Sequence, residues 1–218
     1  MVNSTLQISL IADQQIPSAG KALARAFFND PLCVFTQPDP EPRVSQFTWL
    51  FTDLVREAAR QRGAYACACV NRPNGIAVWT PPQAGGPAAD EERRSGTDDM
   101  RPRFDDGAYH RFTSACRHFK RIHQQCMAGP HWYLALLGVS PEWQGRGIGR
   151  ALLVPVLQRA DHERLPCYLQ TFVPGNVPFY EGFGFRVVEA GVEPLSHVPF
   201  WAMRRGPNQG DEHHGSFG

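Results

Sequence analysis

The sequence predicts a mixed α/β domain whose sheet is mainly antiparallel. Apolar residues recur with the two-residue period of strands in some segments and with the 3.6-residue period of helices in others. Two strand-like segments, 64–70 and 76–80, are separated by the turn-forming residues 71–75, which favours a hairpin. A last pair of strand-like segments, 185–189 and 199–204, extends the sheet. We see no repeat and no linker between two cores, so residues 1–205 are predicted to form one domain, with a disordered tail at 206–218.

The first half of the chain alternates between these two periods. Segment 6–11 alternates apolar and polar residues, which predicts a half-buried strand, and helical spacing follows at 16–27 and again at 44–58. Residues 31–42 carry four prolines and are predicted to form an irregular connection. After the hairpin, residues 81–103 are rich in Gly, Pro and charge and are predicted to be a loop or a polar helix.

The third long helix is predicted at 109–126, with an apolar stripe and a basic face. A basic face can attract phosphates, but a run of charge on a helix is more often simply solvated. Gly129-Pro130 ends this helix before the central segment of the chain.

The central segment is predicted to be a strand, a glycine loop and a helix. Residues 132–139 form an apolar run with the length of a buried strand, which Ser140-Pro141 ends. A glycine-rich loop, 144–149, leads into a helix near 148–160, in which Pro155 predicts a kink or local distortion. A strand at 167–171 and a short helical turn at 174–181 follow.

Composition excludes several classes of protein. A net charge of +1 over 218 residues argues against a general nucleic-acid binder. No apolar run has the length of a membrane span, and the N-terminus lacks the features of a signal peptide, so a cytoplasmic location is expected. The six cysteines show no C-x-x-C spacing and are expected to be reduced thiols, and neither they nor the eight histidines predict a metal site.

The strand–loop–helix segment suits an anion. Such a segment directs several backbone N–H groups and the N-terminus of a helix at one point. The glycines at 145, 147 and 149 do not fit the G-x-G-x-x-G of dinucleotide-binding folds, and no lysine follows as in a P-loop.

Two segments resemble the GNAT family of N-acetyltransferases. Residues 139–149, Val-Ser-Pro-Glu-Trp-Gln-Gly-Arg-Gly-Ile-Gly, resemble the family's V-x-P followed by Q/R-x-x-G-x-G/A. Residues 174–185 resemble its Asn…Tyr…Gly-Phe segment at about the usual distance. The chain looks most like the puromycin N-acetyltransferase type, on residues 77–81, Trp132, Pro155, 176–180 and 201–203. The resemblance spans about 5–205 by element order and is close only over 131–190.

The resemblance implies a splayed sheet flanked by helices, with acetyl-CoA bound between the central strand and a diverging neighbour. An amine would attack the thioester directly in a ternary complex. The Leu137 amide is the expected oxyanion donor, Tyr180 the general acid for the leaving thiolate, and Asn176 a residue that orients the cofactor or caps its turn. The expected acetyl-CoA-binding residues are Leu137, Gly138, Val139, Gln144, Gly145, Arg146, Gly147, Ile148, Gly149, Arg150, Asn176 and Tyr180.

The general base is left open by the sequence. Many relatives carry a glutamate where this chain has Tyr133, and the puromycin type has a glutamate where this chain has Gln170. Glu142 and His131 are possible substitutes, although a solvated loop residue is the more ordinary role of either. A water molecule, or an amine that arrives neutral, would need no basic residue at all.

The predicted function is acetylation of a primary amine on a small molecule, such as an amino-nucleoside antibiotic or a related metabolite. The expected partners are acetyl-CoA and that amine, without nucleic acid or membrane, and the expected state is a monomer or homodimer. Two alternatives stay open: acetylation of a protein N-terminus or lysine, and a catalytically silent acyl-CoA-binding module. The loss of both family carboxylates, at Tyr133 and Gln170, is what keeps the silent module in consideration.

Overall fold

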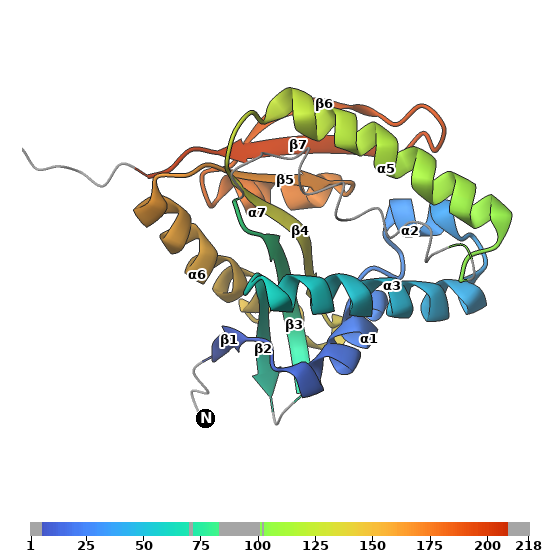
Figure 1. Ribbon diagram of the computed structural model, residues 1–218, viewed down its shortest axis with the longest axis horizontal. Helices are drawn as coiled ribbons and strands as arrows, with labels where there is room; N and C mark the ends of the chain where they lie inside the picture. The colour runs from blue at the N-terminus through green and yellow to red at the C-terminus, as the bar shows by residue number, and fades with distance from the viewer. Residues whose placement is uncertain (1–5, 70–71, 83–100, 102, 209–218) are drawn as a thin grey trace, which may run out of the picture.

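The computed structural model describes residues 6–69, 72–82, 101 and 103–208. Within them the chain forms a seven-stranded sheet in the order β1-β2-β3-β4-β5-β7-β6 (Figure 1). Neighbouring strands are antiparallel except β4 and β5, which are parallel. The predicted mixed α/β fold with a mainly antiparallel sheet is confirmed. The strands are β1 (Ile8–Leu10), β2 (Ala64–Cys69), β3 (Arg72–Thr80), β4 (Trp132–Val139), β5 (Cys167–Thr171), β6 (Arg186–Val192) and β7 (Pro199–Arg205).

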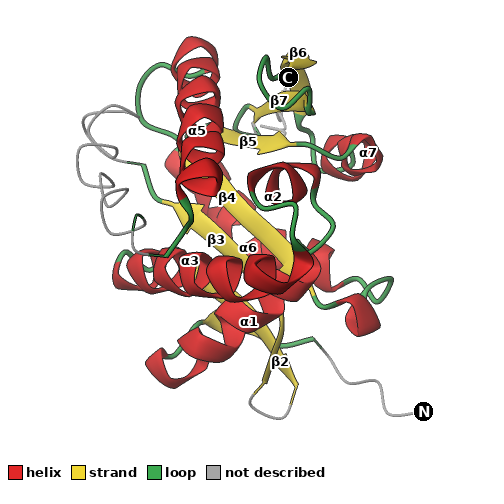
Figure 2. Ribbon diagram, turned by 90° about the vertical axis from the view of Figure 1, so that its right-hand side faces the viewer, coloured by secondary structure: helices red, strands yellow, loops and turns green. Residues whose placement is uncertain are grey.

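Helices cover both faces of the sheet (Figures 1 and 2). Successive residues of β3 show why, since Ile76 and Val78 pack into a core with α1 and α3, whereas Ala77 and Trp79 pack into a second core with α6. A strand that is buried on both faces is apolar throughout, as segment 76–79 is. The helices are α1 (Ile16–Ala26), α2 (Pro31–Thr36), α3 (Pro40–Arg60), α5 (Asp106–Cys126), α6 (Ile148–Glu163) and α7 (Val177–Glu181).

The sheet opens between β4 and β5. The two strands pair only from Trp132–Cys167 to Leu134–Leu169, although β4 continues to Val139. Beside the last pair, Ala135 forms a β-bulge, because Trp79 pairs with Leu134 and Val78 with Leu136. A bulge increases local twist and bends its strand. The second half of β4 therefore has β3 on one side and an open edge on the other, which is the splay that the resemblance implied.

The connection 31–42 corrects the sequence prediction, because it contains α2 and the start of α3. Pro31 and Pro40 each occupy the first position of a helix, where the missing N–H has no intrahelical partner to lose. Asp30 caps α2, since its Oδ1 accepts hydrogen bonds from the backbone N–H groups of Leu32 at 2.9 Å and Cys33 at 3.3 Å. The prolines that suggested an irregular segment are helix-start residues.

Other differences are smaller. β3 begins at Arg72, so most of the predicted turn 71–75 belongs to the hairpin strand. α6 continues through Pro155, and the kink or local distortion expected there stays a prediction. The predicted loop or helix at 81–103 falls largely on residues 83–100 and 102, and the predicted tail largely on 209–218, both outside the described residues. None of the described helices has the length and apolar character needed to cross a membrane.

Candidate active site

The open edge of β4 presents backbone polar groups to the splay. The N–H of Ser140 donates to the carbonyl of Asn74, its direct partner on the β3 side, at 2.8 Å. In an antiparallel pair, hydrogen-bonded and non-bonded positions alternate. Gly138 and Leu136 are therefore turned toward β3, and the peptide groups of Leu137 and Val139 point the other way, where β5 has diverged. This is the orientation that an oxyanion donor at Leu137 requires.

The glycine loop forms an exposed cradle at the end of β4. Gly145 and Gly147 have φ values of +73° and +76°, and a Cβ added to either would meet nothing within 4 Å. Gly147 caps α6, so the amides of the next three residues have no carbonyl to pair with inside the helix. Left-handed glycines followed by a helix N-terminus direct N–H groups outward, as anion binding requires.

The side chains of the loop lie beside this cradle. Gln144 folds back and donates from Nε2 to the carbonyl of Val139 at 3.1 Å. The guanidinium groups of Arg146 and Arg150 lie over the rings of Trp143 and Phe183, at 4.8 and 4.7 Å from the ring centroids. Ile148 is buried in the core below the loop. Two exposed positive charges are thus held next to the outward-facing amides.

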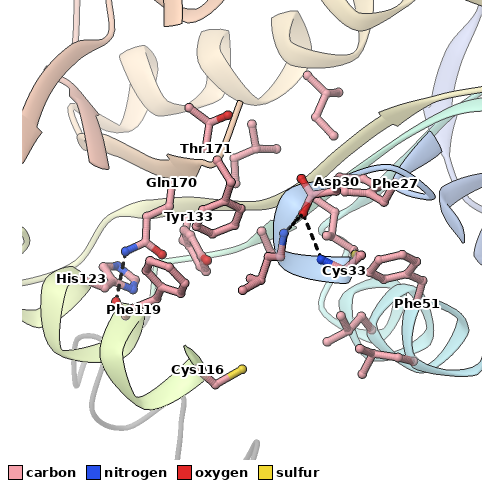
Figure 3. Close-up of a pocket in the computed structure, with 18 of the residues that line it drawn as sticks. Phe27, Asp30, Cys33, Phe51, Cys116, Phe119, His123, Tyr133, Gln170 and Thr171 are labelled. Atoms are coloured by element: carbon pink, nitrogen blue, oxygen red, sulfur yellow. Dashed lines mark hydrogen bonds between the residues drawn. The ribbon is translucent and has the colours of Figure 1, made fainter. Parts of the chain in front are cut away.

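A cavity of about 350 Å³ lies next to the splay. It reaches from Leu137 and Tyr180 at the open edge of β4 to α2, α3 and α5, which form its outer walls. Figure 3 shows Thr171, Gln170 and Tyr133 on the sheet side, with Phe119 and Cys116 of α5 and Phe51 of α3 on the facing walls. Its aromatic lining consists of Phe27, Phe47, Phe51, Phe112, Phe119 and Phe172, together with Tyr133 and Tyr180.

Tyr180 and Asn176 face the same cavity from the turn after β5. Tyr180 is buried, and its ring makes edge contacts with Phe179 and Phe185. Burial raises the pKa of the Tyr180 phenol, so it carries its proton at neutral pH. Asn176 donates from Nδ2 to Oγ1 of Thr171 at 3.2 Å, which joins the turn to the end of β5.

A polar cluster lies at the α5 side of the cavity. His123 and His131 approach each other at 2.7 Å between their Nε2 atoms, and His123 stacks on the ring of Tyr168 at 4.3 Å. Nδ1 of His131 faces the carbonyl of Gly129 at 2.8 Å, which favours the tautomer protonated on Nδ1. Gln170 donates to the carbonyl of Phe119 and to the Tyr168 hydroxyl, so its amide holds β5 against α5. The basic face predicted for helix 109–126 was expected to be solvated, but His123 of that helix lines the cavity.

A carboxylate lies on the α2 wall. Asp30 lines the cavity, and it is the one acidic side chain among the described residues that do so. Its pKa is raised to about 6, because burial outweighs the two backbone hydrogen bonds that lower it. Asp30 is not among the site residues predicted from the sequence, although the order Asp-Pro before an apolar run is a sign of an N-cap.

Glu142, the candidate base next to the glycine loop, lies apart from the cavity. Its two carboxylate oxygens accept from both terminal nitrogens of Arg25 on α1, at 3.0 and 3.1 Å. It is not among the residues that line the cavity. The catalytic role of Glu142 stays a prediction, and this exposed ion pair gives it no support.

Comparison with known proteins identifies the domain. The family model of the acetyltransferase (GNAT) family matches residues 104–185. An uncharacterised N-acetyltransferase of Schizosaccharomyces pombe is 29% identical over 181 residues, which cover 77% of this chain and 69% of that protein. The matched segment therefore carries a GNAT-family acetyltransferase domain. The peptidyl-lysine N-acetyltransferase YiaC of Escherichia coli is 37% identical over 71 residues, which cover 33% of this chain and 47% of YiaC.

Solved structures share the fold of the GNAT domain at low identity. Arylalkylamine N-acetyltransferase 2 of Aedes aegypti superposes with a TM-score of 0.66 at 12% identity, over 94% of this chain and 100% of that one. A protein of Corynebacterium glutamicum described as histone acetyltransferase HPA2 and related acetyltransferase gives a TM-score of 0.63 at 20% identity, over 94% and 97%. The enzyme class is therefore acyltransferase, and acetyl-CoA is the donor of the family.

The residues present fit an acetyl-CoA molecule. The cradle of Gly145 and Gly147 is open on its outer side, and the peptide groups of Leu137 and Val139 face a gap between strands that has no other backbone partner in the described part of the chain. The glycine cradle suits a pyrophosphate, and the gap beside Leu137 and Val139 suits the amides of a pantetheine arm. Among the described residues, no group of three or more His, Cys, Asp or Glu side chains is arranged to hold a metal ion.

Proposed function

We propose that this GNAT acetyltransferase transfers the acetyl group of acetyl-CoA to a primary amine of a small molecule, by direct attack in a ternary complex. The observation that carries the proposal is the cavity of about 350 Å³ that adjoins Leu137 and Tyr180. Sites for small molecules are concave, mostly apolar and begin at about this size. Figure 3 shows aromatic side chains on several walls, as expected for an acceptor that buries an apolar body.

Each residue of the proposed donor site has a role that follows from its geometry. The amides from Gln144 to Arg150 hold the pyrophosphate, with Arg146 and Arg150 adding charge. The N–H of Leu137 stabilises the oxyanion that forms when the amine attacks, an effect worth about 2.7–4 kcal/mol for a donor of this kind. Tyr180, kept protonated by burial, gives its proton to the departing thiolate.

The likeness to two solved structures whose names specify amines supports an amine acceptor. The mosquito enzyme is named for arylalkylamines, and agmatine N-acetyltransferase gives a TM-score of 0.63 at 15% identity over 92% of this chain and 99% of that one. This chain has Gln170 where the puromycin type has a glutamate, and the Gln170 amide donates hydrogen bonds to Phe119 and Tyr168. Puromycin is therefore tested as one candidate acceptor among several amines.

The peptide alternative rests on the partial likeness to YiaC. A peptide acceptor needs a groove that is open along its length, whereas the described cavity is lined on three sides by residues of α2, α3 and α5. Release of free thiol from acetyl-CoA separates the possibilities when aryl-alkylamines, polyamines, puromycin and lysine peptides are compared. Turnover of small amines supports the proposal. Turnover of peptides alone refutes it, and tight acetyl-CoA binding without any turnover identifies a silent module.

A further inference from the structure

We propose that Asp30 is the catalytic base of this acetyltransferase, and that it binds the ammonium group of the acceptor and removes a proton from it. The inference rests on the proposed function, in which a primary amine enters the cavity. It also defines the acceptor more closely, as an amine that is cationic in solution and is attached to an apolar body. Neither of the carboxylate positions of the related enzymes is used, since they hold Tyr133 and Gln170 here.

The backbone places Asp30 near the open edge of β4. A tight turn follows α1, in which the N–H of Asp30 donates to the carbonyl of Phe27 at 2.9 Å. The ring of Phe27 lies against Gly138, where an added Cβ would come within 3.2 Å of it. Cα atoms that span such a turn are less than about 7 Å apart. Asp30 thus lies on a turn whose Phe27 packs against β4, and Asp30 and Leu137 line the same cavity.

One oxygen of the Asp30 carboxylate is held by hydrogen bonds, and the other is available to a ligand. Oδ1 accepts both hydrogen bonds from the start of α2. No hydrogen bond to Oδ2 is found among the described residues. Figure 3 shows the Asp30 carboxylate on the α2 wall, facing the side of the cavity where Tyr133 and Thr171 lie. An anchored carboxylate with one available oxygen is preorganised to receive an N–H of an ammonium group.

The arginine beside Cys33 does not form an ion pair with Asp30 in the described part of the chain. Arg43 of α3 directs its guanidinium nitrogens at the carbonyls of Phe28, Gln37 and Pro38. Cys33 and Arg43 lie beside Asp30, and the other titratable and charged groups that line the cavity are Cys116, Lys120 and His123 of α5, His131 just before β4, Tyr133 of β4 and Tyr180 of α7. Lys120 lies on the α5 wall of the cavity, whereas the carboxylate on the α2 wall, among aromatic side chains, favours a cationic amine over a neutral or acidic acceptor at that wall.

With Asp30 as base, every proton in the reaction has a donor and an acceptor. The ammonium gives one proton to Oδ2, which leaves a neutral amine and a neutral carboxyl group. The amine nitrogen then bonds to the acetyl carbon, and the carbonyl electrons move to the oxygen beside Leu137. As the C–S bond breaks, Tyr180 gives its proton to the departing thiolate, and the second proton of the nitrogen passes to the resulting phenolate, which restores Tyr180. The third proton stays on the amide, and Asp30 releases its proton to water.

A pair of matched variants tests the role of Asp30. Asn caps a helix about as well as Asp, so Asp30→Asn removes the charge while keeping the cap of α2. Asp39 caps α3 in the same way, through a hydrogen bond from Glu41, and it does not line the cavity. Asp39→Asn is therefore the control for the loss of one capping charge.

For the best amine of the panel, Asp30→Asn is expected to lower kcat/KM about 100-fold or more at pH 7. The wild-type profile of kcat/KM should fall on the acid side with an apparent pKa near 6, and the variant should lose that limb. Acetyl-CoA affinity, measured by calorimetry, should stay within about twofold in the variant, and Asp39→Asn should match the wild type in every measurement.

Two outcomes overturn the assignment of Asp30 alone. One is wild-type kcat/KM with an intact acid limb in Asp30→Asn. The other is loss of that limb in His123→Gln but not in Asp30→Asn, which would transfer the role to the pair of His123 and His131. If the wild type acetylates no amine, the proposed function fails together with the assignment, and this result is distinct from either.

Discussion

Replacing Asp30 with asparagine should stabilise the folded protein at neutral pH while it lowers activity. Burial raises the pKa of Asp30 from 3.8 to about 6, so the charged form is less favourable in the folded state than in the unfolded chain. The folded state therefore binds more protons between these two values. Because of this, the free energy of unfolding falls as the pH rises through the window, and the loss is complete near pH 7.

The size of this effect follows from the shift. A pKa difference of about two units corresponds to a cost of about 3 kcal/mol for holding the charge. Asparagine removes that cost and keeps an oxygen for the N–H groups of Leu32 and Cys33, although the two hydrogen bonds lose the assistance of a charge, about 1 kcal/mol. The net expectation is a gain of about 1–3 kcal/mol at pH 7.

Urea unfolding at pH 7 and at pH 4.5, with wild type, Asp30→Asn and Asp39→Asn, measures this gain. The advantage of Asp30→Asn should shrink toward zero at the lower pH, where the wild-type carboxyl group is protonated, and the m-value should not change. A variant that is less stable than wild type at pH 7, or an advantage that is equal at both pH values, would refute the reasoning. A stabilised but inactive variant is the behaviour expected when a charge is kept for function at the expense of stability.

Three further changes test the rest of the structure. Tyr180→Phe should lower kcat at least tenfold with little change in acetyl-CoA affinity, and an unchanged rate would remove its role as acid. Gly147→Ala places a Cβ where φ is +76° and beside the proposed pyrophosphate site, so calorimetry should show at least tenfold weaker acetyl-CoA binding, and wild-type affinity would contradict the site. Asp161→Asn leaves the buried Arg205 guanidinium without the carboxylate that it meets at 2.7 Å, and should lower the free energy of unfolding by about 2–4 kcal/mol. A loss below about 0.5 kcal/mol in urea unfolding would mean that this pair is effectively exposed.

The sequence predicted the parts of the fold that depend on local periodicity. The apolar run 132–139 is β4, the glycine loop leads into α6, and 174–181 forms a helical turn, all from patterns within a few residues. The prediction failed at 31–42 because proline was taken as a breaker of helices rather than as their first residue.

Local sequence patterns could not predict which residues line the cavity. Asp30 reaches it because the chain reverses after α1, and His123 meets His131 because α5 crosses the start of β4. The carboxylate of Glu142 forms an ion pair with Arg25, which is 117 residues away in the sequence. No spacing within the sequence encodes such contacts, which depend on how the helices pack over the open sheet.

The central claim is that one cavity beside the open edge of β4 brings the acetyl group of acetyl-CoA to a small amine. The most direct measurement is mass spectrometry of the amine panel after incubation with acetyl-CoA and the full chain, with the free thiol determined in the same samples. At least one cationic amine with an apolar body is expected to be N-acetylated, with one thiol released for each amide formed. Tight binding of acetyl-CoA with no acetylated amine in any sample would contradict the central claim.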